Sequence, residues 1–156
     1  MFRTYYTALG TLGAMTASAN SYPGERLGLP ATGSGSLAHL GRRIGALFID
    51  YTAATILAIA FFGYDPMALP DEAGWTLFSP MVIFAVLQIL FIPTLGGSPG
   101  HRIVGMRIMR ADGAWAGLWR PIVRTALLVF VIPAVIWDAD NRGLHDKAAG
   151  LVLVRA

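Results

Sequence analysis

The sequence predicts an all-α membrane protein, and two observations lead to this prediction. The 156 residues are 55% hydrophobic and only 13% charged, whereas soluble domains carry about 25% charged residues. The hydrophobic residues are gathered in three blocks, which is how membrane proteins distribute them. We expect two secure transmembrane helices, a short third membrane segment that spans or re-enters the bilayer, and a small two-stranded β element at the cytoplasmic face.

The first block predicts a helix over about 44–62. Its length is close to the ~20 residues that cross ~30 Å of hydrocarbon, and its one charged residue is Asp50. The sequence Gly-Tyr-Asp-Pro at 63–66 is expected to end this helix. The linker that follows, to about residue 74, contains acidic residues but no Lys or Arg.

The second block predicts a helix over about 75–95. Trp75 lies where an interfacial aromatic side chain belongs. If Ser79 is the helix cap, Pro80 falls at the first helical position, where its missing amide hydrogen costs little. Pro93 and the glycines at 96–97 are expected to end the helix.

The third block, about 121–137, is short. Between Arg124 and Asp138 lies only the uncharged run Thr125–Trp137, which Pro133 interrupts. A run of about 10–14 residues is more often re-entrant or interfacial than spanning. A tilted span stays open if Arg124 extends its charge to the headgroups.

Two later segments share a pattern of glycine, a short apolar-rich stretch and Arg-Ala, namely Gly105–Ala111 and Gly150–Ala156. Within the first, Met106–Ala111 is expected to be a strand, and the Asp-Gly pair after it is a turn signal. The two segments are either a chance similarity or a pair of strands, which must then lie on the same side of the membrane. We expect pairing, with the C-terminus returning to the cytoplasmic side at Pro133.

Basic residues orient the chain. Arg42 and Arg43 precede the first block, the first linker has no Lys or Arg, and the connection over 97–120 has four arginines. The positive-inside rule places the N-terminus and this connection in the cytoplasm, with the acidic linker outside. We expect a multi-pass protein of the inner membrane.

The membrane domain is predicted over residues 37–156, and residues 1–36 differ from it in composition. They are rich in Gly, Ser, Thr, Ala and Pro, which favours a flexible N-terminal tail. The alternative is a signal peptide over residues 1–19, with Arg3, a mildly apolar stretch and the sequence Ala-Ser-Ala at its end.

Asp50 is the most informative candidate site residue. A carboxylate within a hydrocarbon span costs about 2.5–3.5 kcal/mol on insertion scales, so it should face protein or a water-filled cavity. Arg43 precedes it by two helical turns and so lies on the same helix face, about 10 Å away along the axis. Two interpretations stay open: a carboxylate that binds a proton or cation, and a structural ion pair that fixes helix packing.

Two polar clusters are secondary candidates. The cluster His145-Asp146-Lys147 suggests acid–base chemistry or, alternatively, an interfacial group of ion pairs. The segment 97–102, which ends in His101 and Arg102, could hold a phosphate or lipid headgroup, or be a turn before a basic membrane anchor. It lacks the Gly-Lys-Ser/Thr ending of a P-loop.

Several classes of function are excluded by residues that the sequence lacks. There are no cysteines, so disulfides and thiolate metal sites are excluded. The three histidines have no metal-ligand spacing. Most arginines flank the apolar blocks, as topology signals do, rather than forming a nucleic-acid surface. We expect no catalytic residues, no metal, no cofactor and no nucleic-acid partner.

Three motifs carry a family signal: Arg43–Asp50, residues 97–108 followed by Asp112-Gly113, and residues 142–150 followed by Leu151–Val154. Together they resemble the motifs of the RDD family of membrane proteins, named for one arginine and two aspartates. The resemblance covers about residues 38–156 and makes Asp146 the second aspartate. It departs at His101, where lysine is common in the family, and at Leu151, where threonine is usual.

The resemblance implies a membrane protein suspected of transport, with cation/proton exchange suggested for some members. The leading hypothesis is a small transporter-like protein that moves a proton, a cation or another ligand through Asp50. Because two or three helices do not easily enclose a polar path, transport implies a homo-oligomer. The rival hypothesis is an accessory or assembly subunit that binds another membrane protein and transports nothing. An enzyme is not expected.

Overall fold

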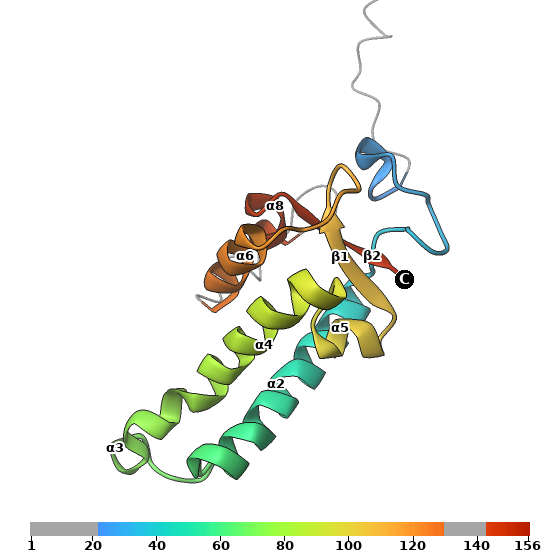
Figure 1. Cartoon of the computed structure of the whole chain (residues 1–156). Coiled ribbons are helices and arrows are strands. Elements are labelled where there is room, and N and C mark those ends of the chain that lie inside the picture. The colour runs from blue at the N-terminus through green and yellow to red at the C-terminus, as the bar shows by residue number, and fades with distance from the viewer. Residues whose placement is uncertain (1–21, 130–142) are drawn as a thin grey trace, which may run out of the picture.

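The computed structural model describes residues 22–129 and 143–156. Two long helices run side by side and project from a smaller region of short helices and a two-stranded sheet, which we call the cap region (Figure 1). The elements in chain order are η1 Glu25–Leu27, α2 Leu40–Phe62, α3 Pro70–Ala73, η2 Gly74–Phe78, α4 Ser79–Leu95, α5 Pro99–Ile103, β1 Met106–Arg110, α6 Trp119–Val129, α8 Leu144–Ala148 and β2 Leu151–Arg155. The cap region comprises α5, β1, α6, α8 and β2.

The long helices α2 and α4 form an antiparallel hairpin whose outer faces are apolar. Leu40–Phe62 and Pro70–Leu95 are long and apolar enough to cross a membrane. Only 22% and 28% of the most apolar 18-residue stretch of each is buried. Large side chains such as Phe48, Ile56 and Leu90 are exposed. The face between the helices is lined by small residues such as Ala46 and Ala54, which allow close approach. These features are typical of helices that face lipid.

The helix ends differ from the predicted ones in two places. Helix α2 begins at Leu40 rather than at residue 44. Helix α4 begins at Ser79, because residues 74–78 form a 3-10 helix. Pro93 was expected to end α4 but lies inside it, since a proline so near a C-terminus removes only one helical hydrogen bond. The helix ends instead at Gly96, whose φ of 70° suits glycine.

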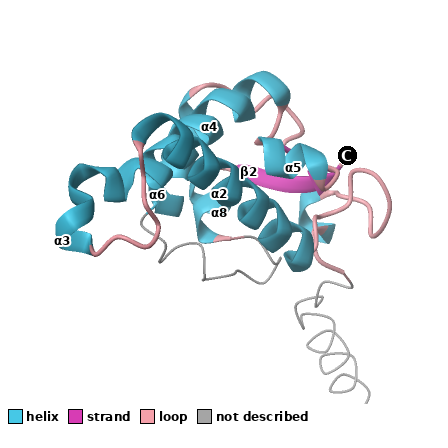
Figure 2. Ribbon diagram, turned by 90° about the horizontal axis from the view of Figure 1, so that it is seen from below, coloured by secondary structure: helices cyan, strands magenta, loops and turns pink. Residues whose placement is uncertain are grey.

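The predicted strand pair is confirmed. Strands β1 and β2 are antiparallel, with Met106 opposite Arg155 and Arg110 opposite Leu151. Leu37 forms an isolated bridge to Val154, so residues that precede α2 extend this sheet. The inward side chains of the sheet pack against the ends of the hairpin helices, and Figure 2 shows the sheet and α5 at the end of the molecule away from α3.

The third apolar block is described only in part. The described part of helix α6 runs from Trp119 to Val129 and lies largely within the block predicted over about 121–137. Residues 130–142, with Pro133, lie outside the described residues, so the third membrane segment stays a prediction. Helix α6 is amphipathic: Trp119 is exposed on one face, and Arg124 and Thr125 are buried on the other.

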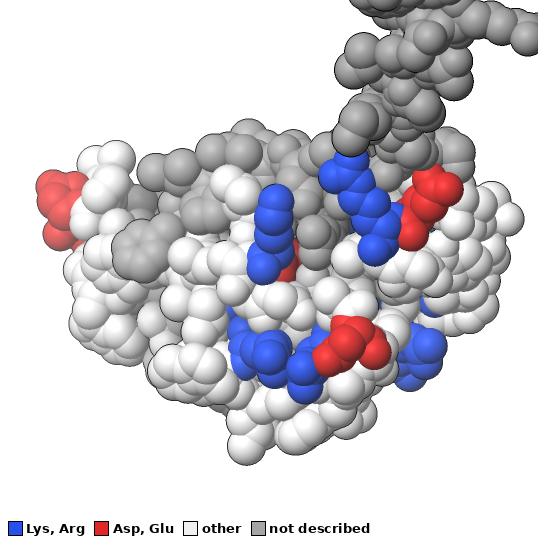
Figure 3. Space-filling view, turned by 90° about the horizontal axis from the view of Figure 1, so that it is seen from above, with Lys and Arg blue, Asp and Glu red and all other residues white. Residues whose placement is uncertain are grey.

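Charge is divided between the two ends of the hairpin. At the tip, the first turn of α3 carries Asp71 and Glu72. Basic side chains gather on the face seen in Figure 3, on the side of the cap region. Exposed basic residues of the described chain at this end include Arg42, Arg102 and Arg107. The two ends of the hairpin therefore differ in charge.

Candidate functional site

Asp50 lies in the middle of α2 and points into the molecule. Its carboxylate is 1% exposed. Oδ2 accepts hydrogen bonds from the Gln88 amide at 3.1 Å and from the Ser98 hydroxyl, and Oδ1 accepts one from the Gly100 backbone N–H at 2.6 Å. The prediction that Asp50 faces protein is therefore confirmed, with hydrogen-bond donors surrounding a carboxylate that would be costly in lipid.

The N-terminus of helix α5 lies against this carboxylate. Ser98 is its N-cap, and the Ser98 hydroxyl oxygen accepts a hydrogen bond from the His101 backbone N–H at 3.3 Å. Gly100 follows in the first turn, and a Cβ atom there would lie 2.3 Å from the Ala46 carbonyl oxygen and 2.9 Å from the carboxyl group of Asp50. Only glycine lets the α5 backbone approach α2 this closely.

His101 connects the Asp50 carboxylate to the interior of the cap region. Its Nδ1 is hydrogen-bonded to the Ser98 hydroxyl and lies 3.8 Å from Asp50 Oδ2. Burial lowers the pKa of His101 to about 3, and the positive charge of Arg124 acts in the same direction. The imidazole is therefore neutral at physiological pH. Asp50, Ser98 and His101 form a continuous row of hydrogen-bonded groups along which a proton can pass from one group to the next.

A second carboxylate, Asp146 in α8, is held by two arginines. Arg124 Nε donates to Asp146 Oδ1 at 2.7 Å, and Arg43 Nη1 lies 3.9 Å from Asp146 Oδ2. Arg43 also donates from Nε to the Ala38 carbonyl at 3.0 Å. Burial would raise the pKa of Asp146, but the charges of Arg124, His145 and Arg43 outweigh burial and lower it. Arg43 and Asp146, on α2 and α8, therefore form a buried ion pair.

Gln88 joins the two carboxylate groups into one network. Its amide nitrogen donates to Asp50, and its amide oxygen accepts a hydrogen bond from Arg124 Nη1 at 3.3 Å. The network therefore connects α2, α4, α5, α6 and α8 through side chains that are almost completely buried. Its formal charges balance, because the two negative charges of Asp50 and Asp146 equal the two positive charges of Arg43 and Arg124. His101 is neutral.

The predicted candidates divide into two groups. Arg43, Asp50, His101, His145 and Asp146 come together in the network, with His145 Nε2 at 3.4 Å from Asp146. Two further candidates, Arg102 and Lys147, are exposed and lie outside it.

Sequence reasoning did not single out three members of the network, namely Gln88, Arg124 and Ser98, although Ser98 lies within the candidate segment 97–102. Gln88 had a signal, since it is the one amide side chain in the predicted helix over about 75–95. A headgroup contact by Arg124 was the condition for a tilted third span, whereas Arg124 is 3% exposed and points inward. Ser98 could have been found from its place before a proline at a helix start.

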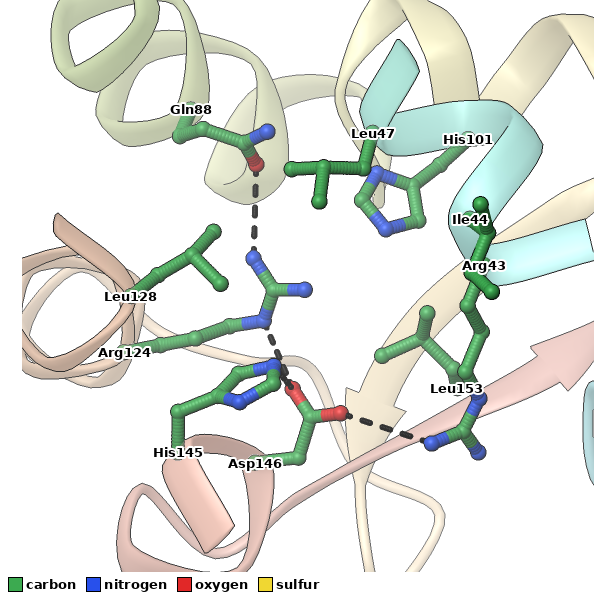
Figure 4. A pocket seen from close by; sticks show the side chains of 10 residues that line it. All are labelled: Arg43, Ile44, Leu47, Gln88, His101, Arg124, Leu128, His145, Asp146 and Leu153. Atoms are coloured by element: carbon green, nitrogen blue, oxygen red, sulfur yellow. Dashed lines mark hydrogen bonds and ion pairs between the residues drawn. The ribbon is translucent and has the colours of Figure 1, made fainter. Parts of the chain in front are cut away.

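A cavity of about 100 Å³ adjoins the network (Figure 4). Arg43, Gln88, His101, Arg124, His145 and Asp146 supply its polar wall, and four aliphatic side chains supply the rest. A polar cavity of this size has room for water. Among the described residues, no group of three acidic or histidine side chains could hold a metal ion.

These features define a class of protein. Two membrane-length helices with lipid-facing apolar surfaces share a buried network of charged and amide side chains with a cap region, which is the arrangement of a helical membrane protein with polar groups inside. The chain belongs to the RDD family, whose family model matches residues 37–150. No curated protein and no solved structure matches the chain.

Proposed function

We propose that this RDD-family membrane protein transfers protons, with Asp50 as the carboxylate that binds and releases them. The observation that carries the proposal is the hydrogen-bonded row from Asp50 through Ser98 to His101, because His101 at its end lines the cavity. Each described hydrogen-bond partner of Asp50 uses a donor group, namely an amide N–H, a hydroxyl and a backbone N–H. Such a site suits a proton better than a metal cation, which requires acceptor oxygens.

The row can pass a proton without forming a charged imidazole. When Asp50 is ionised, the Ser98 hydroxyl donates to it and the Nδ1–H of His101 donates to Ser98. A proton that arrives at His101 Nε2 is balanced by transfer of the Nδ1 proton to Ser98 and of the Ser98 proton to Asp50. His101 stays neutral in its other tautomer, in keeping with its pKa of about 3.

The proposed setting is the inner membrane, with the N-terminus and the cap region in the cytoplasm and the acidic tip of the hairpin outside. The distribution of basic residues supports this orientation. The proposal includes the third membrane segment predicted over about residues 121–137. It also includes a homo-oligomer, because two helices alone cannot enclose a polar path through the half of the hairpin that lies toward its tip.

Proton flux in proteoliposomes tests the proposal. Wild type should acidify vesicles loaded with a pH-sensitive dye when a membrane potential is imposed, and Asp50→Asn should abolish this flux while the protein stays folded. Asp71→Asn, the same change at the exposed tip, is the matched control and should leave flux unchanged. Absence of wild-type flux, or equal flux in both variants, would contradict proton transfer.

The accessory-subunit hypothesis is favoured by a different observation. Large apolar side chains cover the outer faces of both α2 and α4, for example Phe61 and Val86, and could pack against another membrane protein. A strict monomer in mild detergent, together with an Asp50→Asn variant that only loses thermal stability, would support this second function. A stable homo-oligomer with flux would support the first.

A further inference from the structure

We infer that the cap region binds anionic phospholipid of the adjacent leaflet, with the exposed face of α6 against the acyl chains and Arg120 at a headgroup phosphate. This inference does not depend on proton transfer, because it concerns the outer face of α6, whereas the buried network lies on the inner face. It rests on which face of α6 is exposed, on the depth of α6 beside α4 and on the charge of the cap region.

Helix α6 buries its polar side chains and exposes its apolar ones. Arg124 and Thr125 are buried, and Arg124 is part of the network. Trp119, Ile122 and Ala126 are exposed. These three positions recur at the spacing of a helix, so they form one continuous face. A helix at an aqueous surface has the opposite arrangement, with its polar side chains outward. The exposed face of α6 is therefore suited to lipid rather than to water.

Helix α6 lies at the depth of the apolar surface of the hairpin. Arg124 donates a hydrogen bond to Gln88 of α4. Gln88 is seven residues, about 10 Å, from the end of α4 at Leu95. Leu90 and Leu95, which are exposed, belong to this same part of α4. Figure 1 shows α6 beside the half of α4 that is nearer to the cap region. The apolar face of α6 therefore continues the lipid-facing surface of the hairpin.

Aromatic and basic side chains lie together where α6 begins. Trp119 and Arg120 line a recess between the start of α6 and the turn from α8 to β2. Trp115 is also exposed, and its indole N–H donates to the Pro93 carbonyl in the last turn of α4 at 2.8 Å. Tryptophan is enriched at the boundary between hydrocarbon and headgroups. An arginine at this boundary is suited to bind a phosphate oxygen.

Charge favours an anionic lipid as the occupant of this surface. Among the described residues, Arg120 has no hydrogen-bond or ion-pair partner. Arg102 and Arg107 of the cap region are exposed, and the exposed Asp112 is paired with Arg110. Basic side chains outnumber acidic ones in the described cap region, so its net charge is positive. Basic residues near a membrane surface attract acidic headgroups. A second copy of the chain would bring the same positive charge to this face and is therefore disfavoured there.

Spin labels on single cysteines test the position of α6, because the chain has no cysteine of its own. The full chain is reconstituted in vesicles of phosphatidylcholine and phosphatidylglycerol in equal parts. The test variants are Ile122→Cys and Ala126→Cys. Leu90→Cys, on the exposed surface of α4, is the reference for lipid, and Arg107→Cys, exposed on β1, is the reference for water. Collisions of each label with oxygen, which dissolves in hydrocarbon, are compared with collisions with a water-soluble nickel chelate.

The labels in Ile122→Cys and Ala126→Cys should collide mainly with oxygen, as the label in Leu90→Cys does, and the label in Arg107→Cys should collide mainly with nickel. Nickel collisions in Ile122→Cys as frequent as in Arg107→Cys would place this face in water and overturn the inference. Few collisions with either reagent would show that a protein partner or a second copy covers the face, which also overturns it.

Native mass spectrometry of the full chain in a neutral detergent tests the headgroup. The probes are phosphatidylglycerol and phosphatidylcholine, whose choline cancels the phosphate charge, each titrated separately. Wild type should bind phosphatidylglycerol about tenfold more tightly, a factor that one hydrogen bond to a charged group provides. Arg120→Gln should lose this preference, whereas Arg107→Gln, the matched change on β1, should keep it. Equal binding of the two lipids by wild type, or an unchanged preference in Arg120→Gln, would overturn an anionic headgroup at Arg120.

Discussion

Arg124 and Asp146 form a buried ion pair, with Arg124 Nε 2.7 Å from Asp146 Oδ1 and both side chains at most 3% exposed. Arg43 lies farther from the same carboxylate, at 3.9 Å. A buried charge whose partner is removed is strongly destabilising, because its desolvation is no longer compensated. Because Arg124 lies closer to Asp146 than Arg43 does, we expect Arg124 to interact more strongly with this carboxylate.

Replacing Asp146 by asparagine should destabilise the protein by about 3–5 kcal/mol, since it leaves Arg43 and Arg124 buried around a neutral group. In double-mutant cycles, the coupling of Arg124→Gln with Asp146→Asn should reach about 1–3 kcal/mol and exceed the coupling of Arg43→Gln with Asp146→Asn. Unfolding free energies in mixed micelles measure both. A larger coupling to Arg43 would show that Arg124 is not the principal partner.

Replacing Gly100 by alanine should separate α5 from α2, because the added methyl group would overlap the Ala46 carbonyl oxygen and the Asp50 carboxyl group. Overpacking of this kind costs about 1–3 kcal/mol. Gly41→Ala is the matched control, since a Cβ atom at Gly41 meets nothing within 4 Å and alanine favours a helix. Thermal unfolding should place Gly100→Ala well below wild type and Gly41→Ala at or above it. Similar midpoints for both variants would contradict the close approach.

Stability should fall as pH drops below about 6.5, partly because of His101. Its pKa is about 3 in the folded protein against an ordinary 6.5, so between these values the unfolded chain binds a proton that the folded chain does not. Stability from this histidine is complete above pH ~6.5 and decreases by up to about 1.4 kcal/mol per pH unit as pH falls toward the folded pKa.

His101→Asn isolates this contribution, because asparagine keeps a polar group near Ser98 but does not titrate. Melting midpoints at pH 7.5 and pH 5 should differ less in His101→Asn than in wild type. The exposed His39, changed to asparagine, serves as the control and should keep the wild-type difference. An unchanged pH dependence in His101→Asn would assign the titration to other groups near the cavity, such as His145.

The C-terminus should lie on the cytoplasmic side of the membrane. Strand β2 pairs with β1 along its length, so residues 151–155 must lie on the same side as residues 106–110. The arginines of the connection over 97–120 favour the cytoplasm for that side. A fluorescent reporter that folds only in the cytoplasm should be bright when fused after Ala156, and a phosphatase reporter active only outside should be silent. The opposite pattern would reverse this orientation.

The sequence by itself determined the features that depend on local composition. Two apolar blocks of membrane length predicted α2 and α4, because hydrocarbon thickness sets the length of a spanning helix. The repeated pattern around residues 105–111 and 150–156 predicted the strand pair. The cost of a carboxylate in lipid predicted that Asp50 points inward.

Only the tertiary structure decided which groups meet. Asp50 and Arg43 share a helix, and their spacing suggested a pair, yet Asp50 is held by Gln88, Ser98 and a backbone N–H from α5, while Arg43 faces Asp146. Buried polar groups must be satisfied, but many partners can satisfy them, and the choice depends on how α4, α5, α6 and α8 pack. Arg124 shows this most clearly: its position beside an apolar block suggested a headgroup contact, and packing placed it at the centre of the network instead.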